Sequence, residues 1–335
     1  MTLTAARSVS REHLPLIDIA ALRSGVAREC HEVVDKIGSA CRDKGFFYIV
    51  GHGISPHLID DAVTQMRKFF ALPLDAKLAT RGGLIDCRRG YEPIGGQMLD
   101  PGTMPDLKEA FDVGTELPAT DPRVTAGKFN HGPNHWPSGM PGFRSAMDAY
   151  FPAMLDLSQR LLSAIGLSLG LADDHFDGFY RDPVAILRLL HYPSQQPHAI
   201  ASEIGAGAHT DWGAITILLQ DDVGGLQIQD GESWIHVQPI PGSYVVNLGD
   251  LIARWTNDRF RSTVHRVVNF SGRDRYSIPF FYDGNPDYHV ACLPNCSGPE
   301  DPPKYRPITG EGHIIEMQRR ADLRTHARRH DVQDI

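Results

Sequence analysis

Three residues in the second half of the chain have the types and spacing of a metal site. His209 and Asp211 stand two positions apart in GAHTDWGAITILLQD, where alternating apolar residues predict a strand. Side chains two apart on a strand project from the same face. His265, in the predicted strand STVHRVVNF, can supply a third ligand from a neighbouring strand. Two imidazoles and one carboxylate that leave the rest of an octahedron open favour non-haem Fe(II).

A second pair of polar residues follows at the same spacing. Arg275 and Ser277 lie two apart in RYSIPFF. A planar guanidinium beside a hydroxyl suits a carboxylate that is held through two hydrogen bonds. The alternative is that Arg275 only pairs with an acid of the chain, such as Asp250 or Asp283. The pattern therefore predicts an acid-binding site close to the metal.

These five residues, in this order, resemble the isopenicillin N synthase-like branch of the Fe(II)/2-oxoglutarate-dependent dioxygenases. The resemblance covers most of the chain and includes LPLIDIAAL, ACRDKGFFYIVGHGIS, FFALP, DDVGGLQIQ and RWTNDRFRSTVHRVVN. It implies that the two histidines and the aspartate bind Fe(II). It also implies that Arg275 and Ser277 hold the far carboxylate of 2-oxoglutarate.

One departure from the family concerns the co-substrate. The family often has an Asn-Tyr-Tyr-Pro turn where this chain reads Leu190-His191-Tyr192-Pro193. Tyr192 is kept and is expected to contact the co-substrate or the substrate, with a role as an aromatic core residue as the alternative. The asparagine is absent, so this chain must hold the co-substrate without it.

The resemblance implies a reaction class and leaves the substrate open. Fe(II), 2-oxoglutarate and dioxygen would act together, with ascorbate as a reductant, to release succinate and carbon dioxide and to abstract hydrogen from a small molecule. Hydroxylation, desaturation or cyclisation can follow. The alternatives are a 2-oxoglutarate-independent oxidase of the isopenicillin N synthase kind, an ethylene-forming enzyme, and a metal-binding jelly roll that senses or stores a ligand without turnover.

A long polar segment is the candidate substrate-binding region. Residues 81–107 are rich in Gly, Pro, Asp and Arg, a composition typical of loops that close over a site. The paired arginines in this segment favour an anionic or strongly polar group on the substrate. By position in the family, the candidate substrate residues are Arg88, Arg89, Tyr91, Phe111, Phe281 and Tyr282, each with a purely structural role as the alternative.

The order of predicted elements indicates one mainly β domain with flanking helices. Between residues 181 and 300, short apolar runs recur about every ten residues, which predicts a β-sandwich or barrel. The resemblance narrows this to a cupin-like double-stranded β-helix, or jelly roll. Residues 1–180 form a mixed α/β region that is expected to pack on the jelly roll. Residues 301–335 form a helical extension that packs over the barrel or mediates subunit contact.

Local patterns place the elements of the first half more closely. Apolar residues at helical spacing predict helices over 27–44, 55–71 and 143–170, and FFYIV at 46–50 predicts a buried strand. The remaining polar and glycine residues are expected to have structural roles. Gly224 and Gly225 are predicted to form a tight turn, and Asn247 and Asp250 to cap a turn. Core or surface positions are predicted for His52, His191 and His236.

Composition limits the kinds of partner. The chain has 335 residues, 33 Lys and Arg against 41 Asp and Glu, and a net charge of −8, which argues against nucleic-acid and anionic-membrane partners. No apolar run reaches the roughly 18 residues of a spanning helix, so we expect a cytoplasmic protein. We also expect it to be a monomer or a weak homodimer. The odd number of cysteines predicts thiols, and Cys292 and Cys296 alone are a weak metal or redox pair.

Overall fold

The computed structural model describes residues 14–23, 27–82, 87–100, 102–195 and 204–333. Its centre is an eight-stranded sheet and a four-stranded sheet. The larger sheet has the order β1 (Leu16–Asp18), β2 (Phe46–Val50), β10 (Tyr244–Leu248), β7 (Ile215–Gln220), β12 (Arg275–Gly284), β5 (Val184–Tyr192), β4 (Glu109–Gly114) and β3 (Gly90–Glu92). The smaller sheet has the order β6 (Ala206–His209), β11 (His265–Val267), β8 (Leu226–Asp230) and β9 (Ser233–His236). A separate short pair consists of β13 (His289–Val290) and β14 (Ile308–Thr309).

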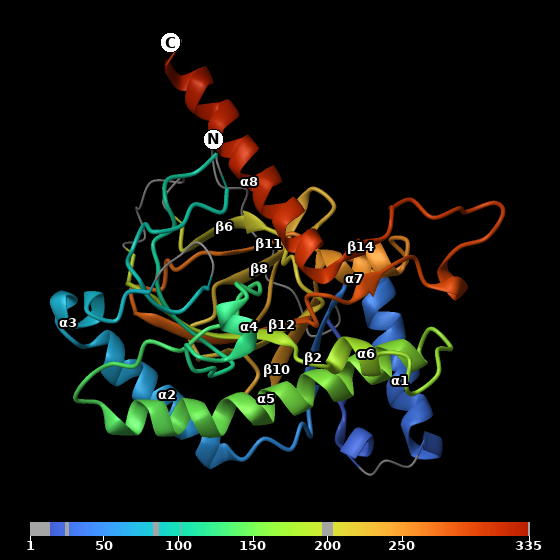
Figure 1. Ribbon diagram of the computed structural model, residues 1–335, viewed down its shortest axis with the longest axis horizontal. Helices are drawn as coiled ribbons and strands as arrows, with labels where there is room; N and C mark the ends of the chain where they lie inside the picture. Colours follow the sequence, from blue (N-terminus) through green and yellow to red (C-terminus); the bar gives the residue numbers. More distant parts are fainter. Residues whose placement is uncertain (1–13, 24–26, 83–86, 101, 196–203, 334–335) are drawn as a thin grey trace.

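Helices cover the outer side of the larger sheet (Figure 1). The three longest helices of the first half were all predicted from apolar spacing, and the strand at 46–50 is confirmed as β2. The helical segments are η1 (Ala20–Arg23), α1 (Ala27–Asp43), α2 (Pro56–Phe70), α3 (Leu74–Leu78), α4 (Pro122–Thr125), α5 (Pro141–Leu167), α6 (Asp177–Tyr180), α7 (Asp250–Trp255), η2 (Pro294–Cys296) and α8 (Gly310–Gln333). Among the described residues, none of these helices is both long and apolar enough to cross a membrane.

Side chains of strand β12 point alternately to the hydrophobic core and to a cavity on the other face of the sheet. Phe280 and Tyr282 on β12 belong to the core, where the Phe280 ring lies 5.2 Å from that of Phe151 on α5. Ser277 and Phe281, on the opposite face of β12, line a cavity. Because successive side chains of a strand point to opposite faces, one strand can supply both packing and binding groups.

The N-terminal strands belong to the same sheet as the later ones. β2 pairs with β10, and β4 pairs with β5 over six residue pairs. The region before residue 180 thus shares backbone hydrogen bonds with the rest of the larger sheet. The boundaries at residues 180 and 300 stay predictions.

Two further predictions concern turns and the C-terminal end. Gly224 and Gly225 form the turn between β7 and β8 with φ of 80° and 93°, and a Cβ at Gly225 would lie 2.2 Å from the Val268 carbonyl oxygen. Only glycine fits there without strain. Helix α8 begins against the body of the protein, where His313 contacts the Trp212 carbonyl oxygen, and its far end extends away (Figure 1). The five cysteines form no disulfide.

Candidate active site

The smaller sheet brings together the three residues that were predicted to bind metal. β11 pairs with β6 so that His265 lies directly opposite His209, and Asp211 follows the end of β6. Asp211 Oδ1 lies 3.8 Å from His209 Nε2 and 3.7 Å from His265 Nε2. Two atoms bound to one ion at about 2.1 Å each can be at most about 4.2 Å apart. Both distances are below that limit, and the ligand atoms of the three side chains all lie within 4.8 Å of one another, so this group could hold a metal ion.

Both imidazoles are oriented for metal binding by their second nitrogen. His209 Nδ1 lies 2.7 Å from the Gly207 carbonyl oxygen, and His265 Nδ1 lies 3.1 Å from that of Thr263. A carbonyl can only accept, so Nδ1 carries the proton and Nε2 presents its lone pair. Burial, together with the neighbouring His265, lowers the pKa of His209 to about 3. His209 is therefore neutral near pH 7, as a metal ligand must be.

The carboxylate of Asp211 is held by two side chains of the larger sheet. Thr216 Oγ1 and Asn247 Nδ2 each donate to Asp211 Oδ2 at 2.6 Å, which leaves Oδ1 for a metal. Burial opposes the charged form, but the two histidines and these hydrogen bonds outweigh it and lower the pKa of Asp211. Asn247 was predicted only to cap a turn. That assignment is wrong, because Asn247 lies opposite Thr216 in the β10–β7 pair and points at Asp211.

Replacing Asn247 with leucine is expected to weaken Fe(II) binding by about 10- to 100-fold, since outer partners of metal ligands typically contribute that much. The larger apolar side chain leaves Asp211 with one donor and a freer carboxylate. Anaerobic Fe(II) titration measures the effect. Asn285→Leu, a substitution of an asparagine that donates to Gly178 away from the site, is the control. Equal Fe(II) affinities in both variants would contradict this role of Asn247.

Arg275 is a buried cation that forms no ion pair with an acid among the described residues. It is fully buried, its Nε donates to the Gly224 carbonyl oxygen at 2.5 Å, and its Nη1 donates to Ser277 Oγ at 3.0 Å. Nη2 has no hydrogen-bond partner among the described residues, and neither Asp250 nor Asp283 pairs with the guanidinium. The guanidinium carbon lies 4.7 Å from the centre of the Tyr192 ring. An unpaired buried charge is costly, so this site is suited to an incoming carboxylate.

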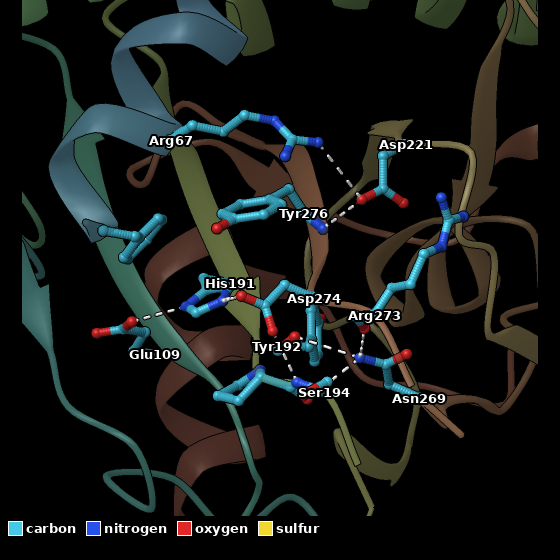
Figure 2. A network of polar contacts seen from close by, with 12 residues as sticks. Arg67, Glu109, His191, Tyr192, Ser194, Asp221, Asn269, Arg273, Asp274 and Tyr276 are labelled. Atoms are coloured by element: carbon cyan, nitrogen blue, oxygen red, sulfur yellow. Dashed lines mark hydrogen bonds and ion pairs between the residues drawn. The ribbon is translucent and has the colours of Figure 1, made fainter. Parts of the chain in front are cut away.

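The opposite face of β5 and β12 carries a polar network that fixes the strands bearing Tyr192 and Arg275. Figure 2 shows the His191 ring between Glu109 and Asp274. Its Nδ1 lies 2.7 Å from Glu109 Oε1 and its Nε2 lies 3.3 Å from Asp274 Oδ2. The ring is stacked on Tyr276 at 4.7 Å. The predicted structural role of His191 agrees with this position outside the cavity.

A cavity of about 460 Å³ connects the metal triad with Arg275. Its wall includes Ser277 and Tyr192, and Leu190 lines it where the family often has asparagine. Of the six predicted substrate residues, Arg88 and Phe281 also line it. Segment 81–107 contributes to the wall, although it is not one continuous loop because it contains β3. Its residues 83–86 and 101 lie outside the described residues.

The other four predicted substrate residues are placed away from this cavity. The Arg89 guanidinium donates to the side chain and carbonyl of Asn130, and the Tyr91 hydroxyl donates to Glu109 at 2.6 Å. Phe111 and Tyr282 are fully buried in the core, among aromatic rings of the helix-covered face. All four alternate in sequence with cavity-facing neighbours, and the prediction assigned them to the wrong face.

A charged cluster in the cavity wall was missed by sequence reasoning. The Nε atoms of Arg88 and Arg188 each lie 3.3 Å from an Asp112 oxygen, and both guanidinium groups also contact Glu92. Arg88 is thus paired with acids of the protein, which removes the reason for expecting an anionic or strongly polar group on the substrate from this arginine. The sequence does contain a signal for this cluster. In LRL and FDV, on neighbouring strands, Arg188 and Asp112 each stand between apolar residues, which indicates a charged side chain inside the protein.

The chain matches two family descriptions. Residues 14–139 match the non-haem dioxygenase in morphine synthesis N-terminal region, and residues 183–284 match the 2OG-Fe(II) oxygenase superfamily. This protein belongs to the Fe(II)/2-oxoglutarate-dependent dioxygenases. It is an oxidoreductase of the isopenicillin N synthase-like branch, whose members use Fe(II), 2-oxoglutarate and dioxygen.

The chain is similar in sequence to proteins of fungi and plants over most of its own length and of theirs. The 2-oxoglutarate-Fe(II) type oxidoreductase hxnY of Emericella nidulans is 43% identical over 307 residues, which is 90% of this chain and 88% of that protein. Homoarginine-6-hydroxylase of Arabidopsis thaliana is 38% identical over 302 residues, 84% of this chain and 88% of its own. A Neurospora crassa protein, solved with α-ketoglutarate and thymine, is 32% identical with a TM-score of 0.82, over 94% of this chain and 99% of its own. The predicted jelly-roll fold is confirmed by this likeness.

Proposed function

We propose that His209, Asp211 and His265 bind Fe(II) in this dioxygenase. The same side of the cavity then holds 2-oxoglutarate through Arg275, Ser277 and Tyr192. The observation that carries the assignment is the buried guanidinium of Arg275, whose Nη2 has no partner among the described residues although it shares a cavity with the triad. A dicarboxylate that reaches both places satisfies the metal at one end and this guanidinium at the other.

The protein groups have separate tasks in this proposal. Bound iron, with 2-oxoglutarate and dioxygen, supplies the oxidising chemistry that releases succinate and carbon dioxide. Asp211 is held in one orientation by Thr216 and Asn247, so its Oδ1 stays directed at the metal. The ring of Tyr192 packs against the guanidinium of Arg275 and excludes water from the ion pair with the co-substrate.

Oxygen uptake by the reduced, iron-loaded protein tests the proposed function. We expect uptake that depends on 2-oxoglutarate and that is matched by succinate release, with ascorbate added as a reductant to maintain Fe(II). Uptake that needs only another substrate would instead indicate an oxidase of the isopenicillin N synthase kind. Ethylene release would indicate fragmentation of 2-oxoglutarate, and Fe(II) binding without any uptake would leave a ligand-binding jelly roll.

The names of the relatives do not select one substrate for this chain. They include a homoarginine hydroxylase and a protein solved with thymine, which differ in charge and shape. We propose a small-molecule substrate that is oxidised by hydroxylation, desaturation or cyclisation, in a cytoplasmic enzyme that acts as a monomer or weak homodimer. Sedimentation of the purified protein tests the last point.

A further inference from the structure

Among the described residues, the substrate end of the cavity contains an acidic side chain, Asp283, that has no partner. Asp283, at the end of β12, lines the cavity two positions beyond Phe281. No described residue forms a hydrogen bond or ion pair with its carboxylate. Its Oδ1 lies against the backbone of Gly213, where an added Cβ would be only 1.9 Å away. Asp283 therefore lies beside the segment that carries Asp211.

The neighbouring cations cannot neutralise Asp283 because they are already shared. Arg88 and Arg188 together balance Glu92 and Asp112, and Lys108 is paired with Asp106 at the same wall. These three cations are thus balanced by three acids among the described residues. Asp283 is a further acid that has no cation to pair with it.

The surroundings of Asp283 agree with an uncompensated charge. Burial, reinforced by Asp211, raises the pKa of Asp283 to about 7, although Arg88 acts in the opposite direction. A second acceptor without a partner faces the same cavity, since Gln97 Oε1 has no hydrogen bond among the described residues. Two further atoms of this wall without a hydrogen bond among the described residues, Arg188 Nε and Asp112 Oδ1, face each other at 3.3 Å. Asp283 and Gln97 have no such counterpart, so they are matched by a ligand that brings donors.

From these contacts we propose that the prime substrate carries a protonated amine or guanidine group that pairs with Asp283. This inference rests on the proposed function, because it concerns the substrate of the same iron site. Apolar side chains complete the wall around this acid, among them Ile186, Phe129 and Phe281. A substrate with a cationic nitrogen and an apolar body fits both features. The cation is then held beside the metal triad, so the carbon that is oxidised lies near the nitrogen.

Ligand screening with matched charges tests this inference. The iron-loaded protein with 2-oxoglutarate is kept anaerobic and mixed with a library in which each cation has a neutral isostere. L-arginine is paired with L-citrulline and benzylamine with benzyl alcohol, and benzoate represents the anions. Thermal shift reports binding, and succinate release in air reports turnover. We expect the compounds that bind and increase turnover to be cations.

Substitution of the acid links this preference to one residue. Asp283→Asn keeps the shape and removes the charge, so the affinity for the best cation should fall by about ten- to a hundredfold, as for a lost charge-assisted hydrogen bond. The affinity for a neutral isostere should change much less. Asp222→Asn, at an acid whose side chain is 78% exposed on the surface, is the matched control.

The inference is overturned if neutral or anionic compounds are the ligands, if nothing in the library binds, or if Asp283→Asn binds the best cation as well as the unaltered protein does. Fe(II) and 2-oxoglutarate titrations of the unaltered protein accompany the screen. If these titrations fail, the proposed function itself is wrong. If they succeed and cations still do not bind, only the assignment of the substrate class is wrong.

Discussion

Asp211→Ala is expected to abolish oxygen uptake that depends on 2-oxoglutarate and to weaken Fe(II) binding by more than about 100-fold. The change removes the single carboxylate of the triad and leaves two imidazoles, which do not favour Fe(II) as a complete facial triad does. The expected loss exceeds the roughly 10- to 100-fold that is typical for outer partners of a metal ligand. Anaerobic Fe(II) titration and oxygen uptake measure the two effects.

The control for this variant is Asp222→Ala, which removes an exposed acid near the end of β7. Its Fe(II) affinity should equal that of the unaltered protein. Because Thr216 and Asn247 lose their acceptor in Asp211→Ala, unfolding is measured in parallel to show that the variant is folded. Stoichiometric, tight Fe(II) binding with normal turnover in folded Asp211→Ala would rule out the triad.

Arg275→Lys is expected to lower the affinity for 2-oxoglutarate by roughly tenfold or more and to leave Fe(II) affinity nearly unchanged. Lysine keeps the positive charge but loses the planar fork, and a lost charge-assisted hydrogen bond corresponds to about 1.5–3 kcal/mol. Each nitrogen of the guanidinium has a separate task in the proposed site. Nε donates to Gly224, Nη1 donates to Ser277, and Nη2, which has no partner among the described residues, is left for the ligand. Titration of the anaerobic, iron-loaded protein with 2-oxoglutarate measures the change.

Arg273→Lys provides the comparison, since Arg273 lies two positions earlier and pairs with Asp222 at the surface. Its affinity for 2-oxoglutarate should not change. If Arg275→Lys instead kept its affinity for 2-oxoglutarate and lost only the binding of the prime substrate, the guanidinium would hold the substrate's own carboxylate. The 2-oxoglutarate-independent oxidase would then be the better interpretation.

Residue spacing predicted that His209 and Asp211 lie close together, but not how they do so. The strand ends at His209, so Asp211 belongs to the segment between β6 and β7, and the pairing of β6 with β11 brings His265 opposite His209. Amphipathic spacing likewise predicted α1, α2 and α5, since a helix that covers a sheet needs one apolar face. The jelly-roll topology required the family resemblance, because regular spacing of short strands is shared by several β folds.

Predictions about which face of a strand meets the cavity were less successful. Tyr91 and Tyr282 were assigned to the substrate pocket, but an error of one position places a side chain on the opposite face of the sheet. The role of Asn247 depends on its register with Thr216 on another strand, and register is a long-range property. Local sequence could show only that a polar residue interrupts the buried strand YVVNL.

The expectation of an anionic or strongly polar group on the substrate rested on a pair of arginines that the fold separates. The pair Arg88 and Arg89 was interpreted from composition, whereas the structure separates the two side chains. Arg88 joins a cluster with Asp112, and Arg89 donates to Asn130. The balance of charge at a site depends on acids that are distant in sequence, so it can be counted only after the strands are assembled.

A crystal structure of the protein grown without oxygen, with Fe(II) and 2-oxoglutarate, would show both halves of the proposed site at once. We expect an iron ion bound by His209 Nε2, His265 Nε2 and Asp211 Oδ1. We also expect one carboxylate of 2-oxoglutarate to accept hydrogen bonds from Arg275 Nη2 and from Ser277 Oγ, while the other end of the molecule binds the iron. Iron at any other set of side chains, or 2-oxoglutarate bound away from Arg275, would contradict the proposed site.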